Sequence, residues 1–466
     1  MTPLPLARIA QWTGGRLLGD EVLIDAVATD TRTLDASDGR AALFIALKGE
    51  HFDGHDHAVA AAEAGARALL VQRQVDVDLP QVLVADTERA LAAFASALQR
   101  TRDTKVAAIT GSNGKTSVKS LLLPMLAGAH ASPGNRNNEI GLPLAVLDAP
   151  EDAPYAIYEM GAGKPGDIGY LTAVVRPDVA LVNNIAPAHL ERMGTLLGVA
   201  NTKAAIYDAL PPGGVAVINA DDAFAPYFAE RAHGRRLIRF GLESSADVSA
   251  RDIVADADGS RFVLTTPNGE VEVRLALPGR HNVRNALAAA SMALGLGASL
   301  EAIRDGLAAA RPVAGRLVPR RLASGATLVD DSYNANPGSL NAAIELLSQT
   351  GQAWLVLGDM RELGDDANAL HAEAGRRAKA AGIARLYTLG ALSAAAAEAF
   401  GEGARHFESH AALAEALAAD LVGAAEAANK DIAASAAPTI LVKGSRGSAM
   451  DRIVKALLEG EGTDAA

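Results

Sequence analysis

A lysine and two hydroxyl side chains follow a glycine-flanked turn in the segment Val106-Ala-Ala-Ile-Thr110-Gly-Ser-Asn-Gly-Lys115-Thr-Ser117. The small apolar residues before the turn predict a buried strand, and Lys115 opens a helical pattern that is expected to run to about Ala127. Converging backbone N–H groups and a helix N-terminus can hold the oxygens of a polyphosphate. The predicted phosphate-binding residues are Gly111, Ser112, Asn113, Gly114, Lys115, Thr116 and Ser117.

This motif departs from the general P-loop formula at one position. The formula places a glycine five residues before Gly114, and that position holds Ile109. The order of strand, loop and helix is kept, so Lys115 is expected to reach the outer phosphates and Thr116 to ligate Mg²⁺. The alternative interpretation is a polar turn that carries a surface lysine.

The composition argues against several classes of protein. A formal charge of −12 and 4% aromatic residues disfavour nonspecific binding to nucleic acid or to anionic membranes. The chain has no cysteine, which excludes disulfides and thiolate metal sites. We find no apolar run near the roughly 18 residues that a membrane span needs, and the first residues do not resemble a signal peptide. No membrane insertion and a cytoplasmic location are therefore expected.

Short apolar runs alternate with helical patterns along all 466 residues, which predicts an α/β fold of three domains. Residues 1–84 are expected to form a small mixed α/β domain, with strands at 23–28, 42–47, 68–71 and 81–84 and a helix at 57–64. A connecting helix is predicted at 87–99. In the first domain, the histidines at 51, 55 and 57 are interpreted as part of a solvent-facing loop rather than a metal site.

Residues 85–313 are expected to form a central P-loop domain around a parallel sheet. Its later strands are predicted at 155–160, 179–185 and 215–218, and a hairpin at 261–277 precedes a long helix. Ligands of such sheets bind at the carboxyl ends of the strands. The phosphate loop, Glu159 and His189 all follow strands, so we expect them to share one site.

Residues 314–466 predict a C-terminal Rossmann-like domain. Strands are expected at 327–329, 354–357, 386–389 and 439–442, with helices at 339–347, 369–381, 391–400 and 411–423. Polar segments follow three of these strands, at 330–337, 358–364 and 443–446. If the two larger domains share a nucleotide, closure by a hinge near Arg311-Pro312 is expected.

Taken together, the motifs resemble the Mur ligases, which are ATP-dependent amide-forming enzymes of peptidoglycan precursor synthesis. The segments that carry the resemblance are 110–117, 159–162, 184–191, 279–285 and 441–446. Within the family, segments 43–55 and 330–337 resemble the member that adds D-alanyl-D-alanine to a UDP-N-acetylmuramoyl tripeptide. An Asp-Asn-Pro-Arg signature, typical of the diaminopimelate-adding relative, is missing.

The resemblance implies roles for individual residues in carboxylate phosphorylation by ATP and attack of an amine on the acyl phosphate. Catalytic roles are implied for Lys115, His189 and Lys203. Two Mg²⁺ ions are implied, with Thr116, Glu159, His189 and a carbamylated Lys203 as ligands. Beyond the phosphate loop, nucleotide contacts are implied for Asn282, Arg316, Asp331 and Tyr333. Contacts to the UDP-sugar are implied for Thr31, Lys48, Asn137 and Asn138, and contacts to the dipeptide for Asn334, Asn336, Ser445 and Arg446.

Some positions depart from the family pattern or admit a simpler interpretation. Lys203 is followed by two alanines, and Arg446 by Gly-Ser-Ala-Met, where the family has other residues. Asn282 could be a helix N-cap, Arg316 a member of a surface ion pair, Asp331 a turn residue and Lys203 a solvated helix lysine.

The leading hypothesis is a monomeric ligase that uses ATP and Mg²⁺. A sibling ligase that adds another amino acid or acts on a recycled muropeptide is the first alternative. A P-loop nucleotide switch without amide chemistry is the second.

Overall fold

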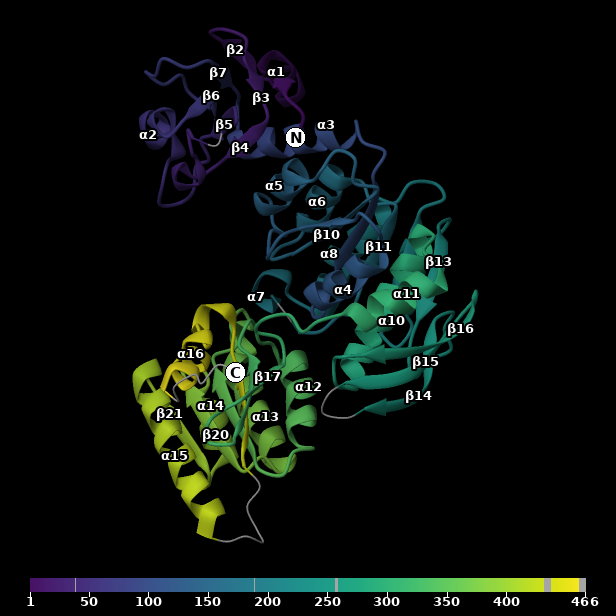
Figure 1. Ribbon diagram of the computed structural model, residues 1–466, viewed down its shortest axis with the longest axis vertical. Coiled ribbons are helices and arrows are strands. Elements are labelled where there is room, and N and C mark those ends of the chain that lie inside the picture. Colours follow the sequence, from purple (N-terminus) through teal and green to yellow (C-terminus); the bar gives the residue numbers. More distant parts are fainter. Residues whose placement is uncertain (38, 188, 256–258, 431–436, 461–466) are drawn as a thin grey trace.

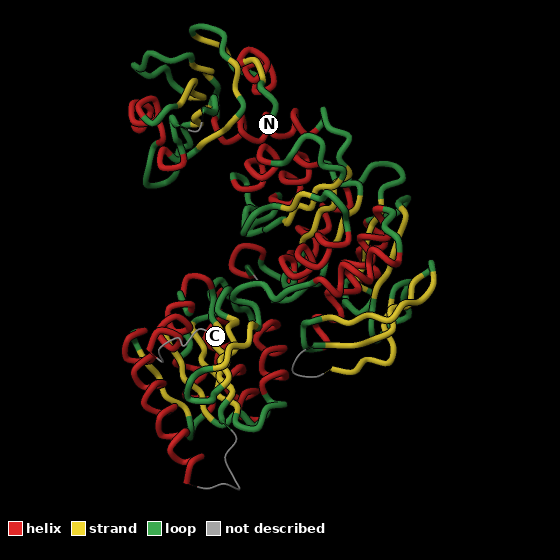
Figure 2. Tube along the Cα trace, viewed as in Figure 1, coloured by secondary structure: helices red, strands yellow, loops and turns green. Residues whose placement is uncertain are grey.

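The computed structural model describes residues 1–37, 39–187, 189–255, 259–430 and 437–460. The chain passes through an N-terminal unit, a middle unit and a third unit in sequence order, from purple through teal to yellow in Figure 1. Each unit combines a sheet with helices, as the tube in Figure 2 shows by colour, so the predicted α/β class is confirmed. Within the described residues, we find no helix long and apolar enough to cross a membrane.

In the N-terminal unit, a five-stranded sheet has the order β2-β7-β6-β5-β4, with only β2 antiparallel. Its strands are β2 (Arg16–Leu18), β4 (Ala26–Ala28), β5 (Ala42–Ile45), β6 (Ala66–Val71) and β7 (Gln81–Leu83). The other elements are β1 (Leu4–Pro5), α1 (Leu6–Thr13), β3 (Leu23–Ile24), η1 (Thr31–Thr33), η2 (Gly54–His57) and α2 (Ala58–Glu63).

Two details of this unit differ from or refine the sequence prediction. The strand expected at 23–28 is interrupted at Asp25, whose carboxylate accepts the N–H of Ala41 at 2.8 Å, so β3 and β4 belong to different sheets. The buried ring of His55 contacts Asp53 through Nδ1 at 2.5 Å and accepts the N–H of Gln72 through Nε2 at 2.8 Å. The expectation of a solvent-facing loop is therefore wrong for His55, which is buried and has a structural role.

A helix connects the first two units as predicted. Helix α3 (Thr87–Gln99) starts at Asp86, whose carboxylate accepts the N–H of Arg89 at 2.9 Å. Such N-caps satisfy an amide that has no partner inside the helix.

The middle unit contains a six-stranded parallel sheet of order β13-β12-β11-β8-β10-β9. Its strands are β8 (Lys105–Thr110), β9 (His130–Ala131), β10 (Tyr155–Glu159), β11 (Val179–Val182), β12 (Val215–Asn219) and β13 (Arg236–Phe240). Val106 and Ala108 face one apolar core, and Ala107 and Ile109 face another. Burial on both faces explains why the strand before the phosphate loop is continuously apolar.

Helices surround this sheet, and a small antiparallel sheet extends it. The helices are α4 (Lys115–Leu122), α5 (Gly141–Asp148), α6 (Asp167–Val175), α7 (Leu190–Met193), α8 (Leu196–Asp208), α9 (Ala225–Arg231), α10 (Arg280–Leu296) and α11 (Leu300–Ala309). The small sheet consists of β14 (Ser249–Ala255), β15 (Ser260–Thr266) and β16 (Gly269–Leu275). Helix α4 ends before the expected Ala127, because Pro124 follows and the chain continues as a 3₁₀ turn, η3 (Leu123–Met125).

The third unit has a six-stranded sheet of order β17-β18-β22-β19-β20-β21, in which only β17 is antiparallel. Its strands are β17 (Val318–Arg321), β18 (Thr327–Asp331), β19 (Ala353–Gly358), β20 (Arg385–Leu389), β21 (Ala404–Phe407) and β22 (Thr439–Lys443). Its helices are α12 (Pro337–Leu347), η4 (Gly364–Asp366), α13 (Ala367–Ala380), α14 (Ala394–Phe400), α15 (His410–Lys430), η5 (Arg446–Ser448) and α16 (Asp451–Gly460). Apolar cores lie on both faces of this sheet.

Candidate active site

The phosphate loop joins β8 to α4, and two asparagine side chains lie against its last glycine. Gly114, at φ 79°, is the N-cap of α4. A Cβ atom there would lie 2.5 Å from Asn183 Nδ2 and 2.6 Å from Asn285 Oδ1. Asn183 Nδ2 also donates to the carbonyl oxygen of Asn113 at 3.0 Å. Only glycine fits this position, because both the backbone angle and the space exclude a side chain.

Thr116 and Glu159 meet beside this loop. The Thr116 hydroxyl donates to Glu159 Oε2 at 2.8 Å, and Asn137 Nδ2 donates to Glu159 Oε1 at 2.9 Å. Burial favours the neutral acid, but Lys115, Lys119 and these hydrogen bonds outweigh it and hold the pKa of Glu159 below its ordinary value. The carboxylate is therefore ionised near neutral pH.

Two lysines lie near His189, and one of them, Lys115, also acts on the Glu159 carboxylate. Lys115 Nζ donates to the carbonyl oxygen of Gly111 at 2.8 Å, and burial lowers its pKa. Lys203, on α8, is 1% exposed. Burial, reinforced by Lys115, lowers the pKa of Lys203 to about 7. Lys203 is thus a buried amine that titrates near neutral pH.

His189 precedes α7 and reaches the third unit. Its backbone is left-handed, at φ 54°, and its Nδ1 lies 2.5 Å from Glu362 Oε2. Burial lowers the pKa of His189, with Glu362 acting against burial and Lys203 and Lys115 acting with it.

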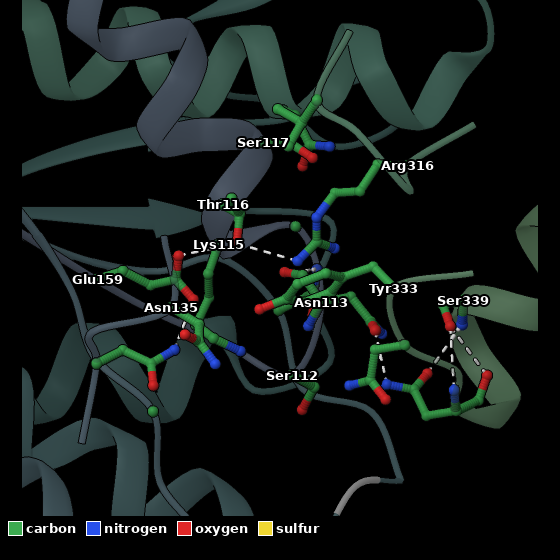
Figure 3. A pocket seen from close by; sticks show the side chains of 18 of the residues that line it. Ser112, Asn113, Lys115, Thr116, Ser117, Asn135, Glu159, Arg316, Tyr333 and Ser339 are labelled. Carbon is green, nitrogen blue, oxygen red and sulfur yellow. Dashed lines mark hydrogen bonds between the residues drawn. The ribbon is translucent and has the colours of Figure 1, made fainter. Parts of the chain in front are cut away.

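Residues of the third unit contact the phosphate loop directly. Arg316 Nη2 donates to the Thr116 hydroxyl at 3.0 Å, and the guanidinium lies 4.4 Å from the centre of the Tyr333 ring (Figure 3). Asn336 Nδ2 donates to Asn113 Oδ1 at 2.7 Å, while its own Oδ1 caps α12. These contacts place the third unit over the mouth of the middle sheet.

Asp331 and Lys443 form a buried pair at the ends of neighbouring strands. The distance between Asp331 Oδ2 and Lys443 Nζ is 2.5 Å, and the ammonium also donates to the carbonyl oxygen of Asn334. Burial raises the pKa of Asp331 although Lys443 opposes it.

A cavity of about 760 Å³ is enclosed by the middle and third units. It collects predicted residues from both units, which are Ser112, Asn113, Gly114, Lys115, Thr116, Ser117, Asn137, Asn138, Glu159, His189, Lys203, Asn282, Arg316, Asp331, Tyr333, Asn334, Asn336 and Arg446.

Four predicted residues do not line this cavity. Gly111 lies at the start of the loop, and Ser445 Oγ donates to the carbonyl oxygen of Ala335 and accepts the N–H of Arg361. Thr31, in η1, and Lys48, which forms an isolated bridge with Asp53, belong to the N-terminal unit. Their contacts to substrate stay predictions.

The simpler interpretations of four site residues are wrong. Gly279, not Asn282, is the N-cap of α10, and Asn282 Nδ2 donates to the carbonyl oxygen of Pro278. Arg316 bonds to a threonine rather than to a surface acid. Asp331 ends a strand, and Lys203 is buried.

Other cavity and loop-supporting residues were not singled out from the sequence. Asn285 was expected to share a face of the first helical turn with Asn282 but was given no role, and Lys443, inside a quoted motif, carried a signal that could have been used. Asn183 and Lys119 carried none, because their contacts depend on how the sheet brings distant segments together.

The residues present fit Mg²⁺ held together with a nucleotide. Thr116 and Glu159 offer hard oxygen ligands, and Mg²⁺ is typically bound by one or two carboxylates plus substrate phosphates. Among the described residues, no group of three or more His, Cys, Asp or Glu could hold a metal alone. A site shared between protein and nucleotide agrees with both observations.

Family profiles match all three units. The Mur ligase family catalytic domain matches residues 24–108, the Mur ligase middle domain 109–293, and the Mur ligase glutamate ligase domain 315–446. The Escherichia coli UDP-N-acetylmuramoyl-tripeptide–D-alanyl-D-alanine ligase is 42% identical over 98% of this chain and 99% of its own. The chain belongs to the Mur ligase family.

Further relatives agree with this membership. The Bacillus subtilis protein of the same name is 35% identical over 97% of each chain. A crystal structure of MurF from Acinetobacter baumannii superposes with a TM-score of 0.90 at 33% identity, covering 98% of this chain and 99% of that one. MurF ligase from Thermotoga maritima in complex with ADP gives 0.80 at 26% identity, covering 93% and 97%. The predicted family and three-domain Mur ligase fold are confirmed, and the chain is an ATP-dependent ligase.

Proposed function

We propose that this Mur ligase joins D-alanyl-D-alanine to a UDP-N-acetylmuramoyl tripeptide during peptidoglycan precursor synthesis, with ATP converted to ADP and phosphate. The supporting observation is the shared cavity, in which Lys115, Thr116 and Glu159 face Asn336 and Arg446 of the third unit. Groups predicted to bind the nucleotide and groups predicted to bind the dipeptide thus line one cavity. The names of the Escherichia coli and Bacillus subtilis relatives supply the substrates.

The proposed reaction has two steps. A carboxylate oxygen of the tripeptide bonds to the terminal phosphorus of ATP, and ADP leaves. The amine of the dipeptide then attacks the acyl carbon, loses a proton, and expels inorganic phosphate as the amide forms. Lys115 would neutralise the phosphate oxygens during transfer, because its ammonium lies at the loop that would hold them, 2.8 Å from the carbonyl oxygen of Gly111.

Two Mg²⁺ ions are part of the proposal. Thr116 and Glu159 would hold one, and His189 and Lys203 the other; when bound, the ions neutralise charge on the phosphates and the acyl group. Lys203 would first add CO₂, forming an N–C bond and releasing a proton. A pKa of about 7 supports this step, since a neutral amine is available as the nucleophile near physiological pH.

We assign binding of the UDP-substrate to residues 1–84 and binding of ATP to residues 85–313. Residues 314–466 would close over ATP and bind the dipeptide. Asn282, Arg316, Asp331 and Tyr333 would contact the nucleotide. Thr31, Lys48, Asn137 and Asn138 would contact the UDP-substrate, and Asn334, Asn336, Ser445 and Arg446 the dipeptide. A monomer that acts in the cytoplasm completes the proposal.

An acceptor panel tests the function. Purified chain is given ATP, Mg²⁺ and the UDP-tripeptide, and phosphate release is measured with D-alanyl-D-alanine or with single amino acids. We expect release with the dipeptide only. Preference for a single amino acid would support a sibling ligase, and slow release without either substrate would support a nucleotide switch.

A further inference from the structure

The segment from the end of β19 to the start of η4, residues 358–364, is anchored firmly although the proposed chemistry does not use it. Met360 and Leu363 are buried in the third unit's core. The Met360 N–H donates to Nε2 of the buried His371 at 2.9 Å, and the Arg361 N–H donates to Ser445 Oγ at 2.9 Å. These contacts fix the backbone on both sides of one half-exposed residue, Glu362.

Glu362 is held in an unusual conformation. Its φ is 62°, in the left-handed region of the backbone that residues other than glycine and asparagine seldom adopt. Such outliers cluster at functional sites, where the surrounding structure maintains them. The next turn of the loop packs on the middle unit, because a Cβ built on Gly364 would lie 3.6 Å from the Cα of Glu191.

The Glu362 carboxylate crosses to the middle unit and contacts His189, with Oε2 2.5 Å from Nδ1. An ionised carboxylate only accepts hydrogen bonds, so Nδ1 of the imidazole carries the proton. In the neutral ring, the lone pair is then on Nε2. His189 lines the same cavity as Lys203, where the Nε2 lone pair can bind a metal ion or another ligand.

We propose that Glu362 is a positioning residue that fixes the tautomer and the orientation of the His189 imidazole from the opposite domain. Ligating histidines commonly donate their second N–H to a carboxylate in this way. Because the two residues belong to different units, His189 would be fully prepared only while the third unit is closed. The catalytic consequence rests on the proposed function, but the tautomer does not.

The first test is ¹⁵N NMR of the histidine rings in the full-length, metal-free chain, with the His189 signal assigned by its loss in H189N. We expect an Nδ1–H tautomer in the unsubstituted chain and in E362Q, whose amide oxygen still accepts. E362A should shift His189 to the Nε2–H tautomer common in solution. Alanine has a similar backbone strain at this position, so any effect of E362A comes from the loss of the carboxylate and not from relief of strain.

D365A is the matched control, because Asp365 is an exposed acid three residues after Glu362, in η4, with no hydrogen bond or ion pair among the described residues. It should leave the tautomer unchanged. In the amide-forming assay, E362A should lower kcat by about 10- to 100-fold with little change in the KM for ATP, whereas E362Q should recover most of the rate.

An unchanged His189 tautomer in E362A would overturn the proposal, as would an equal loss of kcat in D365A. If E362A changes the His189 tautomer but the unsubstituted chain forms no amide, the proposed function fails and the positioning role stands.

Discussion

At the scale of single residues, Lys203 connects burial most directly to chemistry. Its ammonium would be costly inside the protein, and the pKa of about 7 expresses that cost. The resemblance supplied the carbamate hypothesis, but only the structure shows that the lysine is buried beside His189 and Lys115 rather than solvated on its helix.

Replacing Lys203 by alanine should reduce turnover at least 100-fold, because the proposed carbamate oxygens are lost. Acetate or formate should restore part of the rate by filling the space with a carboxylate. The rate of amide formation with and without added carboxylate measures this. Full activity of K203A without any additive would remove the carbamate from the account.

The low pKa of Lys203 also predicts a pH dependence of stability. Between about pH 7 and 10, the unfolded chain keeps a proton on this lysine that the folded chain has released, so folding is favoured as pH rises. Relative to K203M, the free energy of unfolding should therefore increase by up to about 1.4 kcal/mol per pH unit in this window. Denaturant unfolding of both proteins in CO₂-free buffer measures the difference. A constant difference from pH 7 to 10 would contradict the shifted pKa.

At the scale of elements, the sequence predicted best where local signals and burial agree. Helix α3 was predicted with its observed bounds, and Asp86 caps its start. Strand β8 was recognised because burial of both its faces makes it continuously apolar. Strands at sheet edges were missed, namely β2, β9, β13, β14, β17 and β21. They are short or contain charged residues, as in the Val-Pro-Arg-Arg of β17, so no continuous apolar run marks them.

The glycine at the start of α4 gives the sharpest prediction at this scale. G114A should weaken ATP binding at least tenfold, because the new methyl group would collide with the side chains of Asn183 and Asn285. Calorimetric titration with ATP measures the affinity.

G213A is the matched control, since Gly213 has a similar φ of 83° but no atom within 4 Å of the added Cβ. It should cost about 1 kcal/mol of stability for the left-handed backbone and leave ATP binding unchanged. Equal ATP affinity in G114A and the unsubstituted chain would mean that the loop is not the nucleotide site.

At the scale of the whole molecule, the site depends on contacts between units that the sequence could not locate. Strand-end motifs predicted several of the segments that line the cavity, but not that Arg316 reaches Thr116, that Asn336 reaches Asn113, or that Glu362 reaches His189. These pairs join residues far apart in the chain, and their geometry follows from the placement of one sheet against another.

A hinge near Arg311-Pro312 should allow the third unit to move when substrates bind. Small-angle scattering should show a smaller radius of gyration with ATP and the UDP-substrate than without them, because shared ligands favour the closed arrangement. Identical dimensions in both conditions would count against closure in solution.

The central claim is that a terminal phosphate is passed from ATP to a carboxylate in the cavity between the middle and third units. Its most direct test uses UDP-tripeptide in which both oxygens of the reacting carboxylate are ¹⁸O. The released phosphate is then analysed by mass spectrometry. We predict one ¹⁸O atom in each phosphate, because the oxygen that bonds to phosphorus leaves with it when the amine attacks. Amide product accompanied by unlabelled phosphate would contradict the claim.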